Sequence, residues 1–321
     1  MAGIADTRTG AAMRDDARFR LESVSKIYTA TLIHQLAGEG RLRVDDTVER
    51  WLPGLLPDGD RIVIRQLLTM QSGLIDNNDV VNASDSEQQA YLDRVRDEAL
   101  RLRILAISAR VDRNPASEFS PLWWIRLAAW QPLLFTPGSG FHYSNIGYDV
   151  LGLVASSAGG KPLGELYRER IFEPLGLDAT AYDPQGPIQG SHARGYGIHP
   201  DGTRFDASDW HAGVGAEGGI VSNAEETARF LVALMRGELV DLRGVEAMKG
   251  DGLWFGGSAS GCAGRAYGWS GGGSGYKSEV WVDGSGRRVA VLLLNARHWD
   301  TAQPLADAAA HDAMARLFCR A

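Results

Sequence analysis

The chain has 321 residues, a length that suits one large domain or a pair of lobes. Its 33 basic and 40 acidic residues leave a net charge of −7, which argues against a nucleic-acid-binding protein, because such proteins usually carry a basic excess. Hydrophobic residues make up 44% and charged residues 23%, close to the globular average, so the composition excludes intrinsic disorder.

The cysteines and the apolar segments exclude further classes of protein. Cys262 and Cys319 are too few for a disulfide framework or a four-cysteine zinc site. No apolar run approaches about 18 residues, so the sequence predicts no membrane span. Residues 1–16 lack the apolar core of a signal peptide, so we expect a cytoplasmic protein, or an exported one if the N-terminus has been trimmed. The oligomeric state stays open.

The first half of the chain begins with strands and continues as helices. Residues 3–20 predict two short strands around a turn. Residues 25–42 carry apolar side chains at helical spacing, and Gly38 and Gly40 predict the end of that helix. Further helices are expected over 44–52, 62–72, 120–130, 144–159 and 162–176, and one or two helices over 86–111.

The second half returns to strands. Residues 186–215 predict a loop with short strands, and Ser222–Glu225 forms a capping box that opens the next helix. Residues 278–283 and 287–296 alternate with a period of two around a tight turn and predict a hairpin. Residues 302–320 predict an amphipathic helix.

These elements predict an α/β (α+β) fold with an antiparallel sheet flanked by helices. We expect one sheet built from both ends of the chain, with an inserted all-helical lobe. Residues 1–71 and 213–321 would form the sheet lobe and residues 72–212 the helical lobe. A functional site is expected between the two lobes.

Two S-x-x-K patterns are candidates for a serine nucleophile. Ser23 lies at the mouth of a predicted helix, where Lys26 falls one turn along the same face and can reach it. A serine nucleophile needs such a base. Ser274 and Lys277 lie in a turn that leads into a strand, where residues three apart point to opposite faces. The alternative is that Ser23 caps a helix and Lys26 is solvated.

Two further patterns accompany the first. Tyr143-Ser144-Asn145 follows a Thr-Pro-Gly turn, and its alternative interpretation is a capping Asn beside a core Tyr. Trp269-Ser270-Gly271-Gly272 opens the C-terminal strands, and its alternative is a glycine-rich hairpin turn. The chain has 39 glycines, an excess that gathers in residues 213–219 and 250–275. Such clusters are typical of tight turns or of close approach to a ligand.

Together these patterns resemble the serine β-lactamase and penicillin-binding-protein superfamily. The resemblance falls in the branch of class C β-lactamases, D-Ala-D-Ala carboxypeptidases, D-aminopeptidases and family VIII esterases. It runs from about residue 3 to the end of the chain. Six blocks in the family's order carry it: FRLESVSKIYTATLIHQLAGEGRLRVDDTVERWLPG, IRQLLTMQSGL, FTPGSGFHYSNIGYDVLGLV, EPLGL, GGIVSNAEETARFL and YGWSGGGSGY.

The resemblance implies a β-lactamase/transpeptidase-like fold and a set of site residues. Ser23 would be the acylated nucleophile, Lys26 a base or proton relay of low pKa, and Tyr143 the group that passes the proton to the leaving group. Backbone N–H groups would form the oxyanion hole. The N–H groups of the oxyanion hole would be those of Ser23 and Gly272. The substrate would be bound by Asn145, Trp269, Ser270 and Gly271. No metal or cofactor is implied.

Three departures from the family pattern matter. The third motif usually begins with Lys or His, which helps to bind a substrate carboxylate, and Trp269 stands there instead. We therefore expect a preference for neutral esters. Met70 and Gln71 replace a His-Thr pair taken as structural. The family normally has a helix and a full strand before residues 3–6, so the front of this chain is short for the family.

Several other patterns are expected to be structural. Gly268–Gly272 fits the nucleophile elbow G-x-S-x-G, but a strand follows it where an elbow needs a helix. Gly213–Gly218 fits G-x-G-x-x-G without a β-α-β unit, so we expect a tight turn near the site. His142 is expected to be a partly exposed loop side chain. Trp123, Trp124 and Trp130 either roof a substrate pocket or pack between the lobes.

The sequence as a whole predicts a serine hydrolase that acts on small esters or amides through an acyl-enzyme. The alternatives are a D-Ala-D-Ala carboxypeptidase, a D-aminopeptidase, a β-lactamase, an acyltransferase or a catalytically inactive binding homologue. The expected partner is a small-molecule ester, amide or peptide, and neither a nucleic acid nor a membrane.

Overall fold

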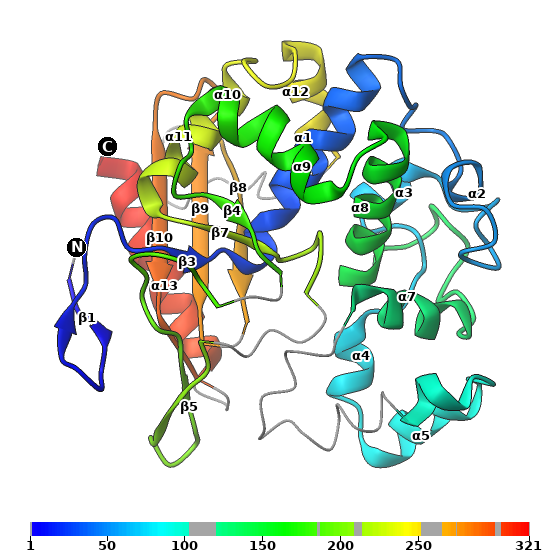
Figure 1. Ribbon diagram of the computed structural model, residues 1–321, viewed down its shortest axis with the longest axis horizontal. Coiled ribbons are helices and arrows are strands. Elements are labelled where there is room, and N and C mark those ends of the chain that lie inside the picture. The colour runs from blue at the N-terminus through cyan, green and yellow to red at the C-terminus, as the bar shows by residue number, and fades with distance from the viewer. Residues whose placement is uncertain are drawn as a thin grey trace.

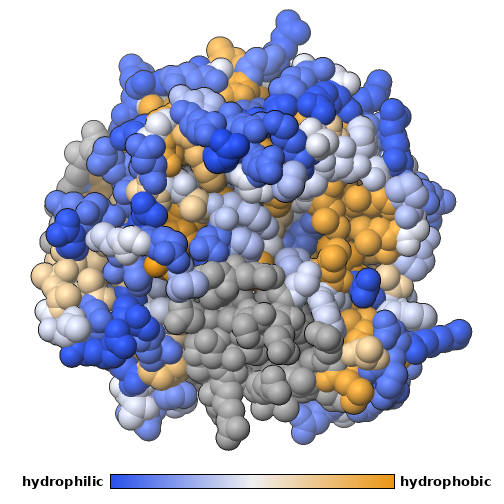
Figure 2. Space-filling view, in the orientation of Figure 1, coloured by the Kyte–Doolittle hydropathy of each residue, from blue (hydrophilic) through white to orange (hydrophobic). Residues whose placement is uncertain are grey.

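The computed structural model describes residues 2–102, 120–184, 187–208, 214–251, 265–273, 275–298 and 303–320. It combines helices with mainly antiparallel sheets, which confirms the predicted fold class. The C-terminal strands and the last helix lie on one side of the molecule, and most of the remaining helices lie on the other (Figure 1). In the same orientation the rim of the surface is largely hydrophilic, and an apolar area lies on the side of the helices (Figure 2).

The C-terminal part forms a three-stranded antiparallel sheet, which confirms the predicted hairpin. The middle strand pairs along its length with both neighbours, so the first and last strands are edges of this sheet. The first strand packs with its other edge against the 3₁₀ turn η1 (Glu22–Val24). The strands are β8 (Ala266–Gly272), β9 (Lys277–Asp283) and β10 (Val289–Leu294).

The two faces of this sheet are covered by different helices. Trp281 points to the face covered by the last helix, α13 (Gln303–Arg320), where its ring meets the Phe318 ring edge to face at 5.8 Å. Val280 and Val282 alternate with it and join the main core on the opposite face. The amphipathic helix expected over 302–320 is therefore confirmed, and the sheet is buried on both sides.

The single sheet expected from both chain ends is wrong for the described residues. The N-terminal strand Phe19–Arg20 runs straight into η1, so it is too short to extend the C-terminal hairpin. It pairs instead with β7, and the other short strands form two further small sheets. These strands are β1 (Ile4–Asp6), β2 (Ala11–Ala12), β3 (Phe19–Arg20), β4 (Ala181–Tyr182), β5 (Tyr196–Ile198), β6 (Arg204–Asp206), β7 (Ile220–Ser222) and β11 (Ala296–His298).

The central helix is α1 (Ser25–Gly38), and it is buried on nearly all sides. A helix that is buried all round belongs to the core and not to the surface. It packs against α8 (Asn145–Gly159). The other helices are α2 (Val48–Trp51), α3 (Ile64–Leu68), α4 (Asn77–Val81), α5 (Asp85–Asp93), α7 (Pro121–Ala129), α9 (Leu163–Tyr167), the π-helical η3 (Arg168–Phe172), α10 (Glu173–Leu175), α11 (Ala224–Met235) and α12 (Leu242–Met248).

The start of α11 corrects one helix prediction. The N-cap of α11 is Asn223, whose side chain accepts from the Glu226 backbone N–H at 2.8 Å. The predicted cap, Ser222, ends β7 and its hydroxyl contacts Thr180 at 2.7 Å, so it is not available to cap the helix. The one or two helices expected over 86–111 begin as α5, and the chain is helical again at residues 98–102 after a break at 94–97; residues 103–111 lie outside the described residues.

One hydrophobic core contains residues from both predicted lobes. Ile27 of α1 and Val280 of β9 share it with Trp124 of α7 and Val150 of α8. This core therefore extends across the predicted lobe boundaries at residues 71 and 213. Within the described ranges, none of the helices has the length and apolar character that a membrane span requires.

Candidate active site

Ser23 stands at the entrance of α1, where the chain leaves β3 and passes through η1. Glu22 makes this change of direction with a φ of +50°, in the left-handed region that non-glycine residues seldom adopt. The N-cap of α1 is Val24, and no side chain caps the helix there. The alternative that Ser23 caps the helix is therefore wrong, and its hydroxyl is available for other contacts.

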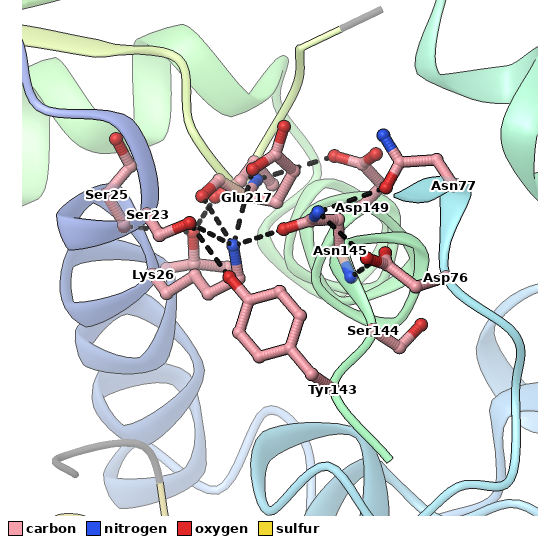
Figure 3. A network of polar contacts seen from close by, with 12 residues as sticks. Ser23, Ser25, Lys26, Asp76, Asn77, Tyr143, Ser144, Asn145, Asp149 and Glu217 are labelled. Carbon is pink, nitrogen blue, oxygen red and sulfur yellow. Dashed lines mark hydrogen bonds and ion pairs between the residues drawn. The ribbon is translucent and has the colours of Figure 1, made fainter. Parts of the chain in front are cut away.

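Two polar groups contact the Ser23 hydroxyl (Figure 3). Tyr143 Oη lies 2.8 Å from Ser23 Oγ, and Lys26 Nζ donates to the same oxygen at 3.1 Å. Lys26 lies one helical turn along from Ser23, as the spacing predicts. The Lys26 side chain is 0% exposed, so the alternative of a solvated lysine is wrong.

The Lys26 ammonium has acceptors on two further segments. Nζ donates to Asn145 Oδ1 at 2.6 Å, to the Glu217 carbonyl at 2.9 Å and to Glu217 Oε2 at 3.3 Å. The rings of Tyr143 and Tyr148 lie 5.1 and 5.6 Å from Nζ, within the range of cation–π attraction. Every side of the amine therefore faces an oxygen or an aromatic ring.

The charge around Lys26 corrects one expectation. Burial acts to lower the pKa of Lys26, but nearby Tyr143 and Glu217 outweigh it and raise the pKa above its usual value. The expected low pKa is therefore wrong. The error arises because the Glu217 carboxylate is 191 residues away in sequence, and no spacing rule indicates it.

The Tyr143-Ser144-Asn145 motif lies at the start of α8. Ser144 is the N-cap of that helix and accepts from the Gly147 N–H at 3.1 Å, so the alternative of a capping Asn145 is wrong. The Asn145 side-chain Nδ2 donates to Asn77 Oδ1 at 3.0 Å, which leaves Oδ1 of the same amide facing Lys26. The motif therefore places a phenol and an amide on either side of the amine.

Three acidic residues around Lys26 were not identified from the sequence. Asp76 supports Asn145, and Asp149 accepts from the Glu217 backbone N–H at 3.4 Å. Burial raises the pKa of Asp76, Asp149 and Glu217 above their usual values. Of the three, only Glu217 lies in a sequence pattern, the G-x-G-x-x-G segment, whose described residues 214–218 form the expected tight turn beside the site.

The glycines of β8 allow the strand to touch the serine. A Cβ on Gly271 would collide with the Leu21 carbonyl and lie 2.9 Å from the Ser23 nitrogen. A Cβ on Gly272 would lie 3.2 Å from Cζ of Arg297. The lack of a side chain on Gly271 lets β8 run this close to η1, and Gly272 leaves room for the Arg297 side chain, so part of the glycine excess serves the close approach.

The side chains of the other two residues of the third motif contact parts of the molecule other than Ser23 Oγ. Trp269 is 6% exposed and belongs to the main core, so little of its ring faces solvent. Ser270 Oγ accepts from Lys277 Nζ at 2.8 Å, and Lys277 also contacts Asp307 at 3.1 Å. The two S-x-x-K lysines therefore lie in different networks, and Lys277 belongs to the α13 side of the sheet.

Glu22 is a further acidic group that sequence patterns did not indicate. Its carboxyl packs on Gly273, where a Cβ would collide with it. Burial raises the pKa of Glu22 to about 7, with Glu217 adding to the effect and Arg20 opposing it. A titratable carboxyl therefore lies immediately beside the serine.

The remaining sequence candidates lie outside this cluster. Ser270 lies within a strand that leads to another strand, so it is not a nucleophile elbow. His142 is a partly exposed side chain that contacts Asp79 at 2.7 Å. Trp124 is in the core, while Trp130 is 39% exposed. Among the described residues, no three His, Cys, Asp or Glu side chains are arranged to hold a metal ion.

Comparison with known proteins finds relatives among esterases and penicillin-binding proteins. The chain is 36% identical over 180 residues to Esterase EstB of Burkholderia gladioli, a match that covers 54% of this chain and 41% of the esterase. The chain therefore spans about two fifths of that relative's length.

Solved structures share the fold over a larger part of the chain. A D-stereospecific amidohydrolase from Streptomyces sp. covers 88% of this chain and 83% of its own, with a TM-score of 0.72 and 25% identity. The D-amino acid amidase from Ochrobactrum anthropi SV3 with L-phenylalanine amide covers 100% and 89%, with a TM-score of 0.76 and 24% identity. The family model named Beta-lactamase matches residues 1–315, and with the Ser23–Lys26–Tyr143 geometry behind it we conclude that the chain belongs to the Beta-lactamase family.

Proposed function

We propose that this protein is a serine hydrolase in which Ser23 attacks a small ester or amide and forms an acyl-enzyme. The observation that supports this most strongly is the position of Ser23 Oγ, 2.8 Å from Tyr143 Oη and 3.1 Å from Lys26 Nζ. A serine hydroxyl becomes a nucleophile when a neighbouring group takes its proton, and hydrogen-bond distance is the geometric condition for that transfer.

The proposed reaction has two halves. As Ser23 Oγ bonds to the substrate carbonyl carbon, its proton passes to the Lys26–Tyr143 pair and the carbonyl π electrons move to oxygen. The backbone N–H groups of Ser23 and Gly272 would hold that oxyanion, and the close packing of β8 on η1 supports this assignment. Tyr143 then protonates the leaving group, whose bond to carbon breaks. Water would release the acyl group by the same steps in reverse.

The remaining assignments concern the substrate. Asn145 faces Lys26 and would bind the acyl-side amide or carbonyl of the substrate. Trp269, Ser270 and Gly271 would line the groove through the backbone of β8, because the Trp269 ring is buried and Ser270 is held by Lys277. No lysine or histidine stands at residue 269 to bind a substrate carboxylate. We therefore propose neutral esters as the preferred substrates, and the relative named as an esterase supports this choice.

The residues of the proposed site come from three parts of the chain, residues 1–71, 72–212 and 213–321. We propose the lobe boundaries at residues 71 and 213 because the site lies where these parts meet. Ser23 and Lys26 belong to the first part, Tyr143 and Asn145 to the second, and Glu217 to the third. A substrate between these parts would touch all of them.

A panel of substrates tests the proposed function. p-Nitrophenyl acetate and butyrate, nitrocefin and a D-alanine p-nitroanilide would be compared by kcat/KM. We expect the esters to be the best substrates, and we expect Ser23→Ala to lose about 10³-fold or more. A faster reaction with nitrocefin or the anilide would refute the ester preference. Undiminished ester hydrolysis by Ser23→Ala would refute the role of Ser23.

A further inference from the structure

Glu217 lies on a turn that fixes its side chain beside Lys26 (Figure 3). Gly219 N donates to Gly215 O at 2.8 Å and closes the turn. Asp149 Oδ1 accepts from the Glu217 backbone N–H at 3.4 Å, and a Cβ on Gly215 would collide with the Asp149 carboxyl. The turn therefore rests directly on Asp149, and the Glu217 side chain is only 12% exposed.

The hydrogen bonds around Lys26 suit an ammonium better than a neutral amine. Four oxygen atoms surround Nζ at 2.6 to 3.3 Å: Asn145 Oδ1, the Glu217 carbonyl, Ser23 Oγ and Glu217 Oε2. An ammonium has three N–H donors for them. A neutral amine has two, so it would leave the buried Glu217 carboxylate without a donor, which is costly in a site of low dielectric constant.

The other carboxyls near Lys26 lie farther from its Nζ than the Glu217 carboxylate does. Among the described residues, Glu217 is the only carboxylate within ion-pair distance of Lys26 Nζ, at 3.3 Å. Asp149 faces it from α8, Asp76 from the segment before α4 and Glu22 from η1, and burial raises the pKa of each of these three carboxyls. Tyr143 and Tyr148 face it with their rings.

We propose that Glu217 is a positioning residue whose carboxylate keeps Lys26 in the ammonium form in the free enzyme. This inference rests on the function proposed above, in which Lys26 and Tyr143 serve Ser23. An ammonium has no lone pair to accept a proton. Tyr143 takes the proton of Ser23 as a phenolate, which has already lost its own proton to solvent; its oxygen lies 2.8 Å from Ser23 Oγ, and the Lys26 ammonium stabilises the phenolate by its charge.

Titration of Lys26 by NMR tests this inference without any substrate. The chain has four lysines, so lysine labelled with ¹³C at Cε gives four signals, and Lys26→Met assigns the one of interest. In the wild-type protein the Lys26 signal should stay at its ammonium position through pH 10. In Glu217→Gln its titration should fall by about one to three pH units, the size of effect that an opposite charge at this distance produces.

Two control variants and a labelling experiment show whether the change in Lys26 titration comes from the Glu217 contact or from the loss of any negative charge. Glu225→Gln removes a charge of the same sign from a 79% exposed side chain of α11 and should leave the Lys26 titration unchanged. Glu217→Asp keeps the charge and should restore most of the wild-type value. The rate of Ser23 labelling by a fluorophosphonate should decline at high pH in Glu217→Gln and not in the wild type.

Two results would overturn the inference. One is a Lys26 signal that titrates identically in the wild type and in Glu217→Gln, and the other is a wild-type Lys26 that is neutral at pH 7. If the Lys26 titration falls in Glu217→Gln while wild-type Ser23 takes no label, the Glu217 contact is supported and the proposed hydrolase function fails.

Discussion

At Ser23 the chain brings together an amine three residues away and a phenol 120 residues away. The first contact follows from helical spacing, whereas the second depends on α8 packing against α1. The neighbouring carboxyls of Glu22 and Glu217 add negative charge that the S-x-x-K spacing does not indicate. Lys26, Glu22 and Glu217 influence one another's pKa values. The pH dependence of the site is therefore a property of these groups together.

The carboxyl of Glu22 makes the free energy of unfolding depend on pH. Its folded pKa of about 7 exceeds its ordinary value of 4.5, so folding favours the protonated form. The stability that this carboxyl contributes is fully present below pH 4.5 and is lost as the pH rises through 7. Between pH 5 and pH 8 the wild type should lose up to about 3 kcal/mol that Glu22→Gln retains. Urea unfolding of both proteins at the two pH values measures this.

The matched control for Glu22 is Glu225→Gln, whose exposed carboxyl should leave the pH dependence of unfolding as in the wild type. An unfolding free energy that changes equally with pH in the wild type and in Glu22→Gln would show that Glu22 titrates as an ordinary exposed carboxyl.

At the scale of the elements, the site depends on how closely β8 approaches η1. β8 is an edge strand of its sheet, and it uses its free side to lie along the segment that carries Ser23. Gly271 permits this contact because it has no side chain to separate the strand from the Ser23 nitrogen. The proposed oxyanion hole consists of backbone groups, so its geometry is set by the spacing of two elements.

Adding one methyl group at this contact should damage both stability and activity. In Gly271→Ala the new Cβ would collide with the Leu21 carbonyl and press on the Ser23 nitrogen. We expect a loss of about 1–3 kcal/mol in the free energy of unfolding, the usual cost of overpacking, together with a fall in kcat for the best ester.

Gly38→Ala is the matched control for this change. It lies in α1, where a Cβ meets nothing within 4 Å, and it should be neutral or stabilising by about 0.5–1 kcal/mol. A Gly271→Ala protein as stable and as active as the Gly38→Ala protein would refute the close-approach argument.

At the scale of the molecule, one core joins the parts of the chain that supply the site. α1 packs against α8, α9 and α12, and its Tyr28 ring stacks on Phe230 of α11, so these parts cannot separate without exposing it. The predicted hairpin, the C-terminal helix and α8 were identified correctly, because each has a clear period and clear turn residues. The single sheet built from both chain ends was wrong, since strands of two or three residues pair according to tertiary packing that no local pattern records.

The residues of the candidate site also divide into those that a local motif indicates and those that only tertiary contacts bring together. Ser23, Lys26, Tyr143 and Asn145 could be predicted because each lies in a motif of fixed spacing. Glu217 and Asp149 could not be given roles, because their contacts with the site join segments far apart in sequence. The predicted contact of Trp269 with substrate stays a prediction, and its ring belongs to the main core.

The shared core predicts that the whole molecule unfolds in one step. Tryptophan fluorescence reports on both proposed lobes, because Trp124 lies in α7 and Trp281 in β9. Its urea midpoint should coincide with the midpoint of far-UV circular dichroism. Two separate transitions would show that the lobes fold independently and that the shared core contributes little to their coupling.

The role of Ser23 is tested most directly by its covalent labelling. The folded protein is treated with a fluorophosphonate, digested, and examined by mass spectrometry, with Ser23→Ala and Lys277→Met as companions. One adduct on the peptide that contains Ser23 is expected in the wild type and in Lys277→Met, and none in Ser23→Ala. An adduct on Ser270, or no adduct on folded wild-type protein, would contradict the assignment of Ser23 as the nucleophile.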